Sequence, residues 1–73
     1  MSRVSDESRL DSLRREVKPL ELRGWNAQGE WVLKGQLGDV THIVVRKKVL
    51  TVAIDEFRQA HGKMIASGLL PKS

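Results

Sequence analysis

Residues 25–52, WNAQGEWVLKGQLGDVTHIVVRKKVLTV, contain the clearest indication of the fold. Apolar and polar residues alternate along much of it, and two turn signals interrupt the alternation. A period of two is typical of strands with one buried face, and turn formers between such runs are typical of hairpins. The stretch therefore predicts a small antiparallel sheet edged with positive charge.

Three strands are expected, over residues 20–25, 30–37 and 40–47. A four-residue loop, 26–29, connects the first two, with Gly29 available for a positive φ. A two-residue turn connects the second strand to the third, because Gly38 and Asp39 place glycine at the first turn position. The expected pairs are Leu37 with Val40, Leu33 with Val44, Trp31 with Arg46, Trp25 with Glu30, Leu22 with Leu33, and Gly24 with Trp31.

This pairing divides the sheet into two faces, because successive side chains of a strand point to opposite sides. The expected core face carries Leu20, Leu22, Trp31, Leu33 and Val44. The second face mixes apolar residues with cations and carries Glu21, Arg23, Trp25, Val32, Lys34, Ile43, Val45 and Lys47.

One helix is expected before the three strands in the sequence and another after them. Leu10, Leu13 and Val17 recur at three- and four-residue spacing, which predicts a helix that ends before Pro19. Because a helix of about a dozen residues is marginal in water, this segment is expected either to dock on the sheet or to remain a flexible arm.

After the sheet, one helical stripe carries Leu50, Ala53, Ile54, Phe57, Ala60, His61, Met64 and Ile65. The expected helix spans residues 50–67, with Thr51 as its N-cap. Ser67 and Gly68 form the expected stop. The alternative is that residues 49–53 extend a strand.

Together these elements predict an α+β fold: a three-stranded antiparallel sheet packed by a C-terminal helix, with a short or partly disordered N-terminal helix. All 73 residues are expected to form one small domain. Its expected parts are an N-terminal helix or flexible arm, a sheet, a helix and a tail, over residues 1–18, 19–48, 50–67 and 68–73.

Reactive residue types are sparse and show no catalytic or metal-binding spacing. The chain has no cysteine, and its two histidines, His42 and His61, match no metal-binding motif. We find no nucleophile elbow and no phosphate-cradling glycine loop. We therefore expect no enzymatic activity, no metal and no cofactor. The polar N-terminus and the lack of a long apolar run predict a cytoplasmic protein with no membrane span.

Positive charge dominates, with 13 Lys and Arg against nine Asp and Glu and a formal net charge of +4. This excess favours an anionic partner, either nucleic acid or an acidic protein surface. The expected partner-binding residues are Arg23, Trp25, Lys34, Arg46, Lys47 and Lys48. An exposed tryptophan among cations is typical of interface hot spots. The alternatives are that Trp25 belongs to the core and that the cations only keep a sheet edge soluble.

Three functions fit these features: a regulator that docks on a larger protein machine, a DNA-binding module with its sheet in a groove, and an assembly protein that pairs sheet edges. Val32, Ile43 and Val45 lie among the cations of the second face. Because an apolar centre with a charged rim is typical of protein interfaces, this pattern favours protein recognition. We expect a monomer, with nucleic acid as a secondary contact left open.

Two stretches carry a resemblance that extends over the full length of the chain: the opening SRLDSLRREVKPLELRGW and the hairpin GEWVLKGQLGDVTHIVVRKK. The chain resembles the small transcription regulators of lytic Xanthomonas phages. The resemblance implies a protein that binds the host RNA polymerase, inhibits sigma-dependent promoter initiation and promotes read-through of intrinsic terminators. It includes no signature motif, so it implies no role for any individual residue.

Overall fold

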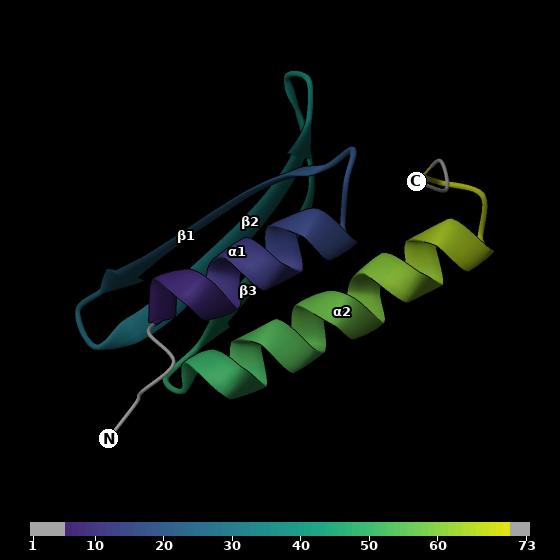
Figure 1. Cartoon of the computed structure of the whole chain (residues 1–73). Coiled ribbons are helices and arrows are strands. Elements are labelled where there is room, and N and C mark those ends of the chain that lie inside the picture. The colour runs from purple at the N-terminus through teal and green to yellow at the C-terminus, as the bar shows by residue number, and fades with distance from the viewer. Residues whose placement is uncertain (1–5, 71–73) are drawn as a thin grey trace.

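The computed structural model describes residues 6–70, so the ends of the predicted arm and tail, 1–5 and 71–73, lie outside it. The elements are α1 (Asp6–Glu16), β1 (Glu21–Ala27), β2 (Glu30–Leu37), β3 (Val40–Lys47) and α2 (Leu50–Ala66). The strands form one antiparallel sheet in the order β1-β2-β3, and both helices cover the same face of it (Figure 1). This confirms the predicted α+β fold and its packing by the C-terminal helix.

The N-terminal segment is docked, so the flexible-arm alternative is wrong for its described part. Leu10, Leu13 and Val17 are buried, and α1 contacts both β1 and α2. A helix of this length needs such packing to be stable. The three apolar side chains of the predicted stripe therefore hold α1 against the sheet.

The C-terminal helix packs on β2 and β3 and differs from expectation mainly at its first turn. Val49 is the N-cap and makes no side-chain cap hydrogen bond, so the predicted cap at Thr51 and the strand alternative over 49–53 are both wrong. The predicted stop is correct: Gly68 has a φ of +77°, and the N–H of Leu69 donates to the carbonyl of Met64 at 2.9 Å.

The chain turns back after this stop, and the predicted tail is part of the core in its described portion. Leu70 is buried and belongs to the same apolar cluster as the stripe of α1. The described part of the tail therefore extends the apolar core beyond the end of α2.

The first hairpin is tighter than predicted. Ala27 pairs with Glu30, and the two residues between them, Gln28 and Gly29, have φ values of 53° and 82°. Two residues with positive φ form a turn whose twist matches a hairpin, so the predicted four-residue loop is wrong. The observed pairs include Trp25 with Val32, Gly24 with Leu33 and Leu22 with Gly35, each two residues from the predicted partner. A displacement of two residues preserves the faces.

The second hairpin begins as predicted and then departs from regular pairing. Gly38 has a φ of +62° in a two-residue turn. Gln36 pairs with Thr41, whereas Gly35 pairs with Ile43, so His42 is an extra residue in β3. Such a β-bulge displaces every later pair by one residue.

The bulge exchanges the two faces of β3, because a one-residue displacement turns each side chain to the other side. The pairs beyond it are Lys34 with Val44, Leu33 with Val45, Val32 with Arg46 and Trp31 with Lys47. Ile43 and Val45 are therefore buried against the helices, whereas Val44 is exposed. The predicted placement of these three residues, and the predicted pairing of Trp31 with Arg46, are wrong.

Two glycines on the core face let the helices approach the sheet. A Cβ atom at Gly35 would lie 2.7 Å from Cζ of Phe57, and one at Gly24 would lie 2.9 Å from methyl carbons of Leu10 and Leu33. Both distances are shorter than a van der Waals contact. Hence α2 packs on the sheet through the ring of Phe57, and α1 packs on it through Leu10.

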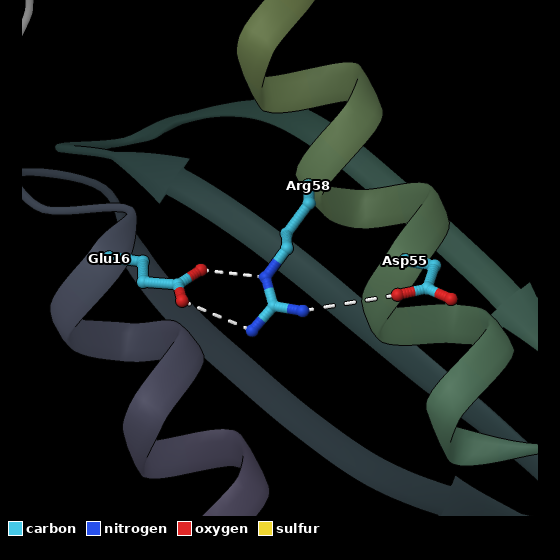
Figure 2. Close-up of polar contacts among 3 residues, drawn as sticks. All are labelled: Glu16, Asp55 and Arg58. Atoms are coloured by element: carbon cyan, nitrogen blue, oxygen red, sulfur yellow. Dashed lines mark hydrogen bonds and ion pairs between the residues drawn. The ribbon is translucent and has the colours of Figure 1, made fainter.

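An ion pair joins the two helices at their surface (Figure 2). Arg58 donates hydrogen bonds to both carboxylate oxygens of Glu16, at 2.7 and 3.1 Å, and lies 3.9 Å from Asp55. The hydrogen bond to Glu16 is the main cause that raises the pKa of Arg58 above its ordinary value. These side chains are largely exposed, so water and salt screen the interaction.

Glu16→Gln is expected to lower the free energy of unfolding by only about 0.5 kcal/mol, because exposed ion pairs contribute little. Because folding raises the pKa of Arg58, the protonated side chain stabilises the folded state. This stabilisation is fully present below the ordinary arginine pKa and is lost only as the pH rises through the folded-state pKa. Arg58 therefore stays charged at neutral pH. Urea unfolding of both proteins in about 0.05 M and about 1 M salt checks this expectation. The loss of unfolding free energy caused by the substitution should be smaller at high salt, and a loss independent of salt would contradict an ionic origin.

Candidate functional site

One face of the sheet has no described element over it, because α1 and α2 both lie on the other face (Figure 1). The cross-strand pairs place six side chains in two adjacent rows on this uncovered side. We call it the open face and define it by Trp25, Val32 and Arg46 in one row and Arg23, Lys34 and Val44 in the next. Side chains directly opposite each other in such rows lie about 5 Å apart and interact.

The open face has an apolar centre. Val32 is only 4% exposed although it lies outside the core cluster, so its neighbours on the open face must shield it. Trp25 pairs with it and is 43% exposed, while Val44 is 61% exposed. The alternative that Trp25 belongs to the core is therefore wrong. Its side chain lies opposite Val32 in the sheet and remains accessible to solvent.

Positive charge surrounds this centre. Arg23, Lys34 and Arg46 form no ion pair with any residue in the described range 6–70. The carboxylates on this side of the sheet, Glu21 and Glu30, stand at the ends of β1 and β2, outside the two rows. The charges of the three cations add within a Debye length of about 8 Å, so the open face attracts negatively charged groups.

Two predicted site residues lie away from the open face. Lys47 points to the helix side, where its Nζ is 3.2 Å from a carboxylate oxygen of Glu56 in α2. Lys48 is exposed in the connection between β3 and α2. The structure thus brings together four of the predicted residues, Arg23, Trp25, Lys34 and Arg46. It adds Val44, which the sequence pattern had assigned to the core.

The open face offers three cations, one aromatic ring and a patch of apolar surface, which are the features by which protein interfaces recognise a partner. Within the described residues no group of three His, Asp or Glu side chains could hold a metal ion. Over the same range neither helix is long and apolar enough to cross a membrane.

Comparison with known proteins adds no relative: no protein-family model matches the chain, and neither a curated protein nor a solved structure matches it.

Trp25 provides a fluorescent reporter for the charge of the open face. In Trp31→Phe protein, where Trp25 is the remaining tryptophan, iodide is expected to quench the emission several times more strongly than caesium, because the three cations concentrate anions near the ring. Stern–Volmer titrations measure this ratio. Trp25→Phe protein, which reports on the half-buried Trp31, is the control with a ratio nearer one. Equal quenching of Trp25 by the two ions would contradict the assigned charge.

Proposed function

We propose that the protein is a regulator that binds the RNA polymerase of its bacterial host, inhibits sigma-dependent initiation and promotes read-through of intrinsic terminators. The resemblance to small regulators of lytic Xanthomonas phages implies this activity. The observation that supports it is the open face, a cationic surface that bears Trp25 and is covered by neither helix of residues 6–70. The protein acts as a monomer in the host cytoplasm, with the polymerase as its partner.

Each part of the open face has a role in such docking. The cations Arg23, Lys34 and Arg46 speed encounter with an acidic polymerase surface, since complementary charge raises the association rate. Trp25 and Val44, the two exposed apolar side chains of the open face, supply the apolar contact that slows dissociation, as central aromatic residues do in protein interfaces. Inhibition follows when the docked protein occupies a surface that sigma needs, or holds two polymerase elements in a geometry that sigma cannot use.

A pull-down from host lysate tests this proposal. Tagged protein is expected to retain the core polymerase subunits in stoichiometric amounts, and nuclease treatment should leave the yield unchanged because the contact is between proteins. If no polymerase subunit is retained with or without nuclease, the proposal is wrong.

The second candidate is a DNA-binding module, because a three-stranded sheet with helices behind it and cations in front could lie in a groove. Three phosphate contacts predict a slope of about −2.7 for log affinity against log salt concentration. A duplex titration across salt concentrations measures the slope. Binding without salt dependence, or no binding, excludes this candidate and leaves the protein-binding function.

A further inference from the structure

The two edge strands of the sheet, β1 and β3, differ in whether another part of the chain bonds to their backbone. At the β1 edge, Nε of Arg14 donates a hydrogen bond of 3.0 Å to the carbonyl of Leu22. β3 forms the other edge, and within residues 6–70 no strand lies beyond it. Alternate backbone N–H and C=O groups of an edge strand point away from the sheet and are available to another strand.

A groove of about 470 Å³ runs between β3 and α2. Four consecutive residues of β3, 42–45, line one wall. Since alternate side chains point to opposite faces, a wall made by consecutive residues exposes the strand's backbone. From α2 come the half-buried Ala60 and Met64, with Glu56 and Lys63 beside them. The groove thus combines a strand edge with an apolar helix surface.

The charge around this edge selects what can pair with it. Arg46 and Lys63 are exposed and form no ion pair with a described residue, while Glu56 is already paired with Lys47. Cations on an edge strand disfavour pairing with a second copy, which would bring the same positive charges. They favour a strand that carries carboxylates.

We propose that β3 accepts an extended acidic segment of the partner as a fourth strand. Its side chains alternate: carboxylates on one side reach toward Arg46 on the open face, and apolar residues on the other enter the groove over Ala60 and Met64. Backbone hydrogen bonds provide affinity and the alternation provides specificity. The inference rests on the proposed function in one respect, that the segment belongs to the polymerase.

A peptide titration of the full chain, followed by NMR, tests the site. The probe is an acetylated and amidated peptide of alternating Glu and Leu, and the two comparison peptides carry Lys for Glu or N-methyl groups on alternate backbone nitrogens. The acidic peptide is expected to slow hydrogen exchange at amides of residues 42–46 and to shift the methyl signal of Met64. Both comparison peptides should bind roughly tenfold more weakly, because one loses charge complementarity and the other loses backbone pairing.

Two variants with the same change of charge sharpen the test. Arg46→Glu should weaken binding of the acidic peptide roughly tenfold, whereas Arg15→Glu, on the exposed surface of α1, should change it less than about twofold. Shifts confined to Arg23, Trp25 and Lys34, with unchanged exchange in β3, would overturn the inference. So would a doubled mass without peptide together with protection of β3, which identifies a second copy as the occupant.

Failure of the inference and failure of the proposed function are distinguishable. Retention of core polymerase by a protein that binds none of the peptides overturns the strand-addition site alone. Peptide binding at β3 without retention of polymerase overturns the proposed function alone.

Discussion

Phe57→Ala is expected to lower the free energy of unfolding by about 4 kcal/mol, because the ring is fully buried and its loss leaves a cavity between α2 and the sheet. A single hydrophobic core in a chain below about 80 residues rarely supplies more than about 5 kcal/mol of stability, so the variant should be partly unfolded at 25 °C. Urea unfolding followed by circular dichroism measures the change. A loss below about 1 kcal/mol would show that Phe57 is not central to the core.

The contact between Phe57 and Gly35 can be isolated by a double-mutant cycle. Gly35→Ala should cost about 2 kcal/mol, because the new Cβ would lie 2.7 Å from Cζ of Phe57. In a Phe57→Leu background, which removes that ring atom, the same substitution should cost at least about 1 kcal/mol less. Strictly additive effects would contradict the packing described.

Gly62→Ala is the matched control for this cycle. A Cβ at this position meets no atom of residues 6–70 within 4 Å, and the residue lies inside α2. Alanine favours a helix more than glycine by about 1 kcal/mol. The control substitution should therefore stabilise the protein, opposite in sign to Gly35→Ala.

Reversing the three cations of the open face is expected to weaken binding to core polymerase by about a hundredfold or more, because each reversal replaces attraction with repulsion. The variant combines Arg23→Glu, Lys34→Glu and Arg46→Glu. Since none of these side chains is buried, the circular dichroism spectrum and melting temperature should change little. Surface-plasmon resonance on immobilised core polymerase measures the affinity.

The control for this experiment has the same net charge but an intact open face. It combines Arg9→Glu, Arg15→Glu and Lys18→Glu, at exposed positions in and after α1. Its affinity should fall less than about tenfold, through weaker long-range steering alone. Equal losses in the two variants would show that net charge, and not the open face, determines binding.

Much of the fold is predictable from local patterns. The observed bounds of β2 and β3 are the predicted ones, because period-two alternation and the Gly38 turn mark both strands. The helix after the sheet differs from prediction by one residue at its end, because its apolar stripe continues to a glycine stop. The sequence pattern could not decide whether α1 docks on the sheet or remains a flexible arm, because tertiary packing and not helix propensity determines the stability of so short a helix.

The pairing details depend on features without a sequence marker. Gln28 adopts a positive φ that its residue type does not favour, so the first turn looked longer than it is. The bulge at His42 inserts one unpaired residue into β3, and no glycine or other turn former marks this position in the sequence. Only the final packing of β3 against the helices shows that Ile43 and Val45, not Val44, are buried.

The shorter first turn and the bulge at His42 had different effects on the predicted site residues. Arg23, Trp25 and Lys34 stayed on one face because the first hairpin is displaced by two residues, which preserves sidedness. In the run 46–48, regular alternation had predicted Lys47 on the second face and Arg46 opposite Trp31 of the core face, and both placements are wrong. The bulge assigns Arg46 to the open face and leaves Lys47 to pair with Glu56.

Hydroxyl-radical footprinting of the protein, free and bound to host core polymerase, tests most directly whether the open face is the binding surface. Oxidation of Trp25 should fall about fivefold or more in the complex, as expected for an aromatic residue buried at an interface centre. Oxidation of Leu69, exposed beyond the end of α2, should stay unchanged. A complex that forms while Trp25 remains as reactive as in the free protein would show that the open face is not the binding surface.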